Sequence, residues 1–226
     1  MKKTFAKLSI VALALFTLNA TAQIKLGVTG GAQVSFSNTD FFTDVKNIAT
    51  PTFGVIAQAN LGAGLMFRPS INYIQDGLKS VENITTQIGP GLTQLTNTNS
   101  TLKMQSLQIP LDVVLGMKAG NGKLLVSLAP VLTIGLNAKY SETEVITRTG
   151  ATPVTNNNSI GLDFSGTNAT FKRLDWGGKL GVGYEFKSGL QLNAAYKAGL
   201  NNIAVGSGDD YKNNNLSLTL SYFFIK

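Results

Sequence analysis

Alternation of apolar and polar side chains is the strongest pattern in this chain, and it is clearest in the final residues. Leu216, Leu218, Leu220, Tyr222 and Phe224 fall at every second position, with small polar residues between most of them. Because successive side chains of a strand point to opposite faces, these residues form one apolar stripe opposite a polar one. Such a strand either packs on a soluble core or faces lipid from the wall of a membrane barrel.

The same alternation recurs in seven earlier segments, which gives eight predicted strands in total. The segments are 24–36, 53–61, 65–73, 107–117, 124–140, 174–186 and 190–200. Helical periodicity is almost absent, so an all-β fold is expected. An even number of strands is what a single-chain antiparallel membrane barrel requires. The apolar residues that interrupt the polar stripes are Met66, Ile74, Val114, Leu125 and Val131.

The connections between these segments alternate in length. Long connections, rich in Asn, Thr, Ser, Gly and Asp, fall at about 37–52, 76–103, 141–171 and 201–214. In an up-and-down barrel, consecutive connections lie at opposite ends, so the long ones share one end and the short turns share the other with both termini. Outer-membrane barrels have this asymmetry, with their short turns in the periplasm. The connections 76–103 and 141–171 could also hold an extra hairpin or extend the walls, so ten strands are the alternative to eight.

Charged residues inside the predicted strands avoid the apolar stripes. Lys25, Arg68, Asp112, Lys139, Arg173, Asp175, Lys179, Glu185 and Lys197 all share the parity of the polar face. A Lys or Arg that faces lipid near the bilayer midplane costs ~2–4 kcal/mol, which would explain the avoidance. A soluble, lipocalin-like binding barrel would segregate charge in the same way, with its apolar face inward. The interior of an eight-stranded barrel just fits side chains, however, so these charges suit a plugged polar core better than a ligand cavity.

Six of these charged residues are predicted to form a network inside the barrel. They are Arg68, Asp112, Asp175, Lys179, Glu185 and Lys197. Mutual pairing would offset the cost of enclosing charges in a narrow bore. We expect a structural role for this network, since eight strands leave little room for a continuous path of water.

The first residues have the organisation of a secretory signal peptide. A basic start is followed by a largely apolar stretch over 5–18 and by the small-residue sequence Ala20-Thr21-Ala22. This stretch is shorter than the ~20 apolar residues of a spanning helix. We therefore expect Sec export, cleavage after Ala22, and a barrel domain over 23–226.

Composition excludes several classes of function. The chain has no histidine and no cysteine, so it lacks the commonest general base and any thiol or disulfide chemistry. We expect no enzymatic activity, no catalytic residue, no cofactor and no metal centre. The net charge of +7 falls to a mild +4 once Lys2, Lys3 and Lys7 leave with the signal peptide, and no basic run suggests a nucleic-acid partner. The long connections are acidic, which solvation explains; a cationic partner or divalent ions are the alternative.

Short motifs in the predicted strands carry a family resemblance. They are Phe-Arg-Pro-Ser-Ile-Asn-Tyr-Ile-Gln-Asp-Gly at 67–77, Leu-Gln-Ile-Pro-Leu at 107–111, and the glycine- and tyrosine-containing segments 175–185 and 195–203. Together they resemble the PorT-like outer-membrane β-barrel family of Bacteroidetes, a porin-type family. The chain departs from the pattern at Ser70 and Ala195, where the family often has Glu and Arg. If those two pair across the lumen in the family, this chain has lost both together.

The patterns and the resemblance predict one fold. It is an eight-stranded, antiparallel, up-and-down transmembrane β-barrel, similar to the OmpX/OmpA type, in a Gram-negative outer membrane. Expected partners are outer-membrane lipid and lipopolysaccharide, the barrel assembly machinery during biogenesis, and an envelope protein.

Three functions are compatible with this fold. The first is a structural or surface-interaction role through the connections 76–103 and 141–171. The second is a narrow, porin-like passage. The third is an accessory role in an envelope secretion complex, with contacts through a basic periplasmic rim. The rim residues are Lys25, Lys118, Lys123, Lys187 and Lys226.

Overall fold

The computed structural model describes residues 24–39, 44–167, 169–206 and 210–225. The strands are β1 (Ile24–Thr39), β2 (Val45–Gly62), β3 (Leu65–Gly89), β4 (Leu92–Ala119), β5 (Gly122–Arg148), β6 (Val154–Leu162), β7 (Leu174–Glu185), β8 (Leu190–Gly199) and β9 (Tyr211–Ile225). No helix among the described residues is long and apolar enough to cross a membrane. The predicted signal peptide, 1–22, lies outside the described residues.

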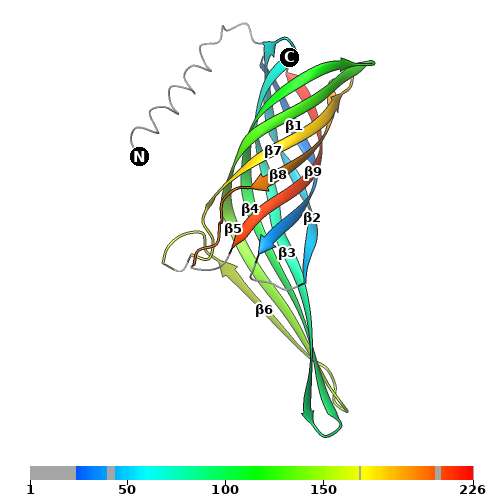
Figure 1. The fold of residues 1–226 in the computed structure, drawn as a ribbon, viewed down its shortest axis with the longest axis vertical. Helices are drawn as coiled ribbons and strands as arrows, with labels where there is room; N and C mark the ends of the chain where they lie inside the picture. The colour runs from blue at the N-terminus through cyan, green and yellow to red at the C-terminus, as the bar shows by residue number, and fades with distance from the viewer. Residues whose placement is uncertain (1–23, 40–43, 168, 207–209, 226) are drawn as a thin grey trace.

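Eight of the strands close into a barrel, and β6 lies outside the ring (Figure 1). β1 to β5 pair in chain order, β5 then pairs with β7, and β7, β8 and β9 continue to β1. All of these pairings are antiparallel. The eight-stranded barrel predicted from the sequence is confirmed, and a ten-stranded ring is wrong. β6 pairs only with the outer part of β5, as an extra hairpin.

Two of the predicted long connections are largely β-structure. β3 and β4 continue through 76–103 and are joined by a tight turn at 90–91. β5 likewise continues to Arg148 before the chain returns as β6. Figure 1 shows these strands passing far beyond the barrel. The alternation predicted no strands here because polar side chains occupy both faces where both are in water, which removes the period-2 signal.

The apolar stripes face outward along the barrel wall. In the final strand, Leu218 is 56% exposed and Leu220 is 50% exposed. Their polar neighbours point inward, where Ser221 and Gln191 are almost fully buried. A soluble lipocalin-like barrel requires the reverse arrangement, so that alternative is wrong. An apolar exterior around a polar interior is the arrangement of outer-membrane barrels.

Aromatic side chains flank this apolar band. Phe53 and Tyr73 stack on neighbouring strands toward the end from which the long strands protrude, with ring centroids 5.2 Å apart. Tyr184 and Phe186 meet edge to face near the short turns, with centroids 5.0 Å apart. Aromatic girdles at both membrane interfaces are a feature of transmembrane barrels.

The outward position of Leu180 gives the first prediction. This residue lies midway along the apolar stripe of β7 and is 59% exposed. We expect Leu180→Arg to reduce the free energy of folding into a bilayer by ~2–4 kcal/mol, because the guanidinium would face lipid. Urea titration of folding into phospholipid vesicles measures the change.

The matched control is Ile84→Arg. Ile84 is similarly exposed, at 48%, but lies on β3 beyond the barrel. Its substitution should change the folding free energy by less than about 0.5 kcal/mol, as for an ordinary surface site. Equal losses in the two variants would contradict the outward-facing apolar band.

Candidate functional site: the closed lumen and the protruding sheet

A small apolar cluster lies in the lumen toward the end with the short turns. Met66, Val114 and Leu125 form a buried cluster in the interior of β3, β4 and β5. These are three of the residues that interrupt the polar stripes of the sequence. Their inward position explains that interruption, because they fill the narrow bore where charged side chains would lack partners.

A larger apolar cluster closes the opposite end of the lumen. Its members are Leu78, Leu102, Met104, Ala138, Phe171, Ile203, Ala204 and Tyr211. Phe171 comes from the connection before β7, and it forms an isolated β-bridge with Ala204 from the connection before β9. Phe171 also packs edge to face against Tyr211, with ring centroids 5.4 Å apart. These connections therefore fold into the mouth of the barrel and block it.

Between the two apolar layers lies a layer of paired charges. Lys197 of β8 donates to Asp175 of β7 over 2.6 Å, and both side chains are buried. Lys179 of β7 donates to Asp112 of β4 over 2.7 Å, past β5, which lies between these two strands. Each enclosed ammonium thus has a carboxylate partner, which offsets much of the cost of removing it from water.

Arg68 joins the remaining members of the predicted network. It stands directly opposite Asp112 in the β3–β4 register. Its guanidinium donates to the Gln191 side-chain oxygen, and the amide nitrogen of Gln191 donates to Glu185 over 2.8 Å. Glu185 also pairs with Lys123 at the rim, at 3.1 Å. The six predicted residues therefore lie inside the barrel as two groups, one around Arg68 and one around Lys197.

Asp76 is a member of the interior that the sequence reasoning missed. The alternation places it in a long connection, yet it is 1% exposed and accepts hydrogen bonds from Gln33 and Ser35. The distances are 2.9 Å and 3.1 Å. Position 76 continues the inward parity of Arg68 and Ser70 along β3, so extending the alternation past Tyr73 would have predicted that Asp76 is buried.

Two other charges lie outside the lumen, contrary to the shared parity predicted for them. Lys139 and Arg173 are both exposed. For Lys139 the cause is a shift of register between Gln105 and Ser106 in the pairing of β4 with β5, which reverses the faces of β5 beyond it. Arg173 lies outside the strands, one residue before β7 begins. Alternation counted through a bulge assigns every later residue to the wrong face.

The described part of the lumen contains a small central cavity of about 70 Å³. Ser70 and Ala195 are among the residues that line it, together with Arg68, Asp112 and Lys179. Ser70 and Ala195 are the positions at which the family that the chain resembles often has Glu and Arg. The space is therefore where a longer pair of side chains would meet.

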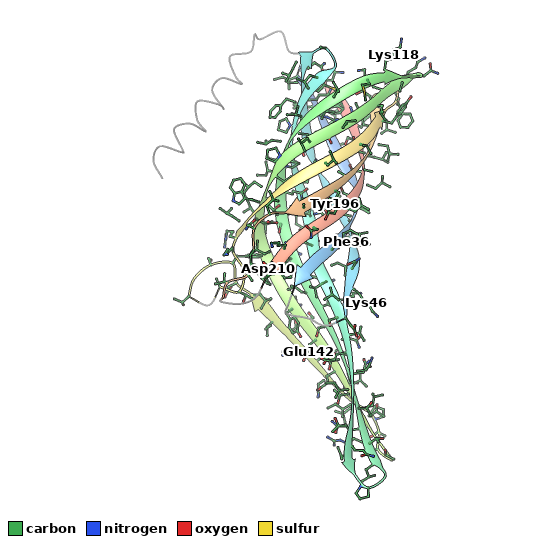
Figure 2. All side chains as sticks on the ribbon, viewed as in Figure 1. Phe36, Lys46, Lys118, Glu142, Tyr196 and Asp210 are labelled. Carbon is green, nitrogen blue, oxygen red and sulfur yellow. The ribbon has the colours of Figure 1, made fainter. Side chains whose placement is uncertain are left out.

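A wider basin opens at the end with the short turns, with a volume of about 880 Å³. Lys25, Lys118, Lys123 and Lys187 of the predicted basic rim line it. Figure 2 shows Lys118 at the tip of this end. Lys226, the fifth rim residue, lies outside the described residues.

Beyond the opposite end, four strands form a sheet that we call the protruding sheet. It consists of 81–89 of β3, 92–99 of β4, 142–148 of β5 and all of β6, in that spatial order. Its inner face, which continues the lumenal side of the barrel wall, carries Glu82, Glu142 and Glu144. Glu142 accepts a hydrogen bond from Tyr140 over 2.6 Å, and Glu144 accepts one from Asn156 over 3.1 Å. Figure 2 shows Glu142 near the base of this sheet.

Sequence comparison identifies the family. A model of the outer membrane protein β-barrel domain matches residues 8–224, nearly the whole chain. The chain belongs to this family. It is thus an outer-membrane barrel. No curated protein sequence matches it.

Several solved structures are similar in topology. Neisserial surface protein A has a TM-score of 0.41 and 10% identity, covering 88% of this chain and 97% of that one. Ail, the attachment invasion locus protein of Yersinia pestis, has a TM-score of 0.34 and 12% identity, with coverage of 88% and 98%. The translocator domain of autotransporter NalP from Neisseria meningitidis has a TM-score of 0.25 and 14% identity, with coverage of 99% and 98%.

The Lys197–Asp175 pair gives the second prediction. Lys197→Met should lower the free energy of unfolding by ~3–5 kcal/mol, because it leaves the Asp175 carboxylate buried without its partner. The double variant Lys197→Met/Asp175→Asn should recover most of this loss. Urea titration in vesicles measures both, and additive losses would show that the two side chains act independently.

Proposed function

We propose that this barrel is a non-enzymatic surface protein whose protruding sheet contacts an extracellular polypeptide. The sheet itself is the observation that supports this most. The ring of eight strands closes without β6 and without the outer parts of β3, β4 and β5. Folding in the membrane therefore does not require the sheet, and a contact outside the cell gives it a purpose. The absence of histidine and cysteine from the sequence favours binding over catalysis.

Both edges of the protruding sheet are open among the described residues. β6 pairs only with β5, and 81–89 of β3 pairs only with β4. Proteins usually block such edges with Lys, Pro or inward-pointing charges, yet β6 reads Val-Thr-Asn-Asn-Asn-Ser-Ile-Gly-Leu. An extended segment of a partner could add to β6 through backbone hydrogen bonds, as in other strand-addition complexes.

The inner face of the sheet supplies side-chain chemistry for such a contact. One row across the four strands holds Glu82, Thr98, Glu144 and Asn156. The adjacent row holds Ile84, Thr96, Ile146 and Val154. An acidic row beside an apolar row favours a partner segment that combines basic and apolar side chains. This agrees with the cationic partner considered for the acidic connections.

A porin-like passage is less compatible with the geometry. The two apolar clusters lie on either side of the charge layer, and the central cavity of about 70 Å³ holds only a few waters. We expect planar bilayers with the protein, or with Asp112→Ala or Glu185→Ala, to show no steady conductance steps.

An accessory role in an envelope complex is the second candidate. The open basin of about 880 Å³ and its lysine rim support it, because they offer a basic, concave surface to periplasmic proteins. Such a role would also suit the PorT-like assignment within the family, which we propose on the motifs at 67–77 and 107–111. Co-purification of periplasmic proteins that depends on Lys118 and Lys187 would favour it.

Removing the protruding sheet gives the third prediction. Val81, Asn99, Thr143 and Asn157 lie in one row across the four strands. Replacing 82–98 and 144–156 each by an Asn-Gly turn therefore trims both hairpins at the same level. Cells that display the trimmed barrel should lose at least tenfold in binding to an immobilised panel of extracellular proteins. The folded, heat-modifiable band on SDS gels should persist.

A second variant distinguishes binding by the acidic inner face of the protruding sheet from binding by its open edge at β6. Glu82→Gln/Glu142→Gln/Glu144→Gln removes the charges but keeps the strands, and should weaken only the binding of basic partners. Equal binding by trimmed and intact barrels, or no binding by the intact barrel, would contradict the proposed function.

A further inference from the structure

Four lysines on the outer wall form two like-charged pairs. Lys46 of β2 stands directly opposite Lys79 of β3, and Lys103 of β4 stands directly opposite Lys139 of β5. Gly77 is the partner of Lys103 across β3 and β4, so Lys79 and Lys103 are diagonal neighbours. We call these four residues the lysine cluster. Its members occupy four adjacent strands. Their Cβ atoms are roughly 5 Å apart within each pair and roughly 7–8 Å apart on the diagonal.

The lysine cluster points away from the lumen. Leu78 and Ser80, which flank Lys79, are both buried, as are Leu102 and Met104 on either side of Lys103. All four lysines are exposed. The register irregularity in β5 turns Lys139 outward, so that it joins the others on the same side of the wall.

No described carboxylate neutralises the lysine cluster. The ion pairs among the described residues involve Lys123, Lys179, Lys197 and Lys212. Glu82 and Glu142 lie on the opposite face of the same strands, and Asp44 forms no ion pair with Lys46. Like charges placed directly opposite each other destabilise a sheet. The protein therefore concentrates positive charge here at a cost to its own stability.

The position of the lysine cluster identifies a source of negative charge. On β4, the outward residues are Leu107, Gln105 and Lys103. Leu107 marks the edge of the apolar band, and Lys103 lies ~13 Å farther along the strand. Strands of such barrels tilt by about 35–45°, so the ammonium groups lie ~10 Å above the band. The polar headgroup layer of a bilayer extends roughly 5–8 Å above the hydrocarbon on each side, so the long lysine side chains reach its phosphates from its outer edge. Figure 2 shows Lys46 at the opposite end of the barrel from Lys118, where the protruding sheet begins.

We propose that the lysine cluster binds the phosphate groups of a phosphorylated glycolipid in the outer leaflet. The cluster continues the lipid-facing wall, and two pairs of ammonium groups match the multiple negative charges of phosphates. Charge-assisted hydrogen bonds from lysine to phosphate are strong. The bound phosphates replace the missing carboxylates and relieve the repulsion between the paired lysines.

Lipid titration in a zwitterionic detergent tests this proposal. The full-length barrel is titrated with bisphosphorylated lipid A, with its dephosphorylated form, and with phosphatidylglycerol, and bound lipid is counted by native mass spectrometry. The variant is Lys79→Gln/Lys103→Gln/Lys139→Gln. The matched control, Lys25→Gln/Lys118→Gln/Lys187→Gln, removes the same charge at the periplasmic rim.

The expected result is selective. The intact barrel and the rim control should bind bisphosphorylated lipid A equally, and the cluster variant at least tenfold more weakly. Removal of phosphate from the lipid should weaken binding to the intact barrel by a similar factor. Without lipid, the cluster variant should melt at the same temperature as the intact barrel or higher, because it has lost like-charge repulsion. A misfolded variant would melt lower and is thereby recognised.

Three results would overturn the proposal. The first is equal lipid A binding by the cluster variant and the rim control. The second is phosphate-independent binding. The third is phosphatidylglycerol binding as tight as that of lipid A, which would assign the contact to anionic lipid in general.

Discussion

Closure of the ring by the first and last strands is the constraint on which the rest of the structure depends. β1 pairs with β9 from Leu26 to Thr39, and this pairing joins the first strand to the last. β4 pairs with β5 along most of their length, so the ring is also continuous there. In hydrocarbon, an unpaired backbone N–H or C=O costs several kcal/mol, so a spanning sheet has no stable open edge. A ring of eight strands then fixes the bore, and this bore is so narrow that side chains must fill it.

The filling of that bore follows from the same constraint. The outward side chains have to be apolar, so the inward positions carry the polar and charged residues of each strand. Enclosed charges are tolerable only when paired, and Lys197 with Asp175 and Lys179 with Asp112 meet that condition. Apolar clusters at both ends complete the filling. The interior of this barrel is thus a packed core, and its chemistry with partners must occur on its rims and beyond them.

The sequence predicted the barrel well because period-2 alternation is strong wherever one face meets lipid. It predicted the protruding sheet poorly, because 81–89 and Val154–Leu162 have water on both faces and alternate weakly. Asp76 was missed because it opens a polar segment that was assigned to a long connection, whereas β3 continues through it. Lys139 was placed on the wrong face because one irregularity in pairing lies between it and the rest of β5. A bulge leaves no reliable trace in a single sequence, so the face of Lys139 could be found only from the pairing itself.

Trp176 tests the central claim, that the apolar stripes face lipid, most directly. It is the only tryptophan of the chain, it lies on the outward stripe of β7, and 53% of its surface is exposed. Its fluorescence should be strongly quenched when the folded barrel is placed in vesicles of brominated phospholipid, compared with vesicles of the unbrominated lipid. Unchanged fluorescence in the folded, vesicle-bound protein would mean that this stripe faces the interior, and would contradict both an apolar outer wall and a polar lumen.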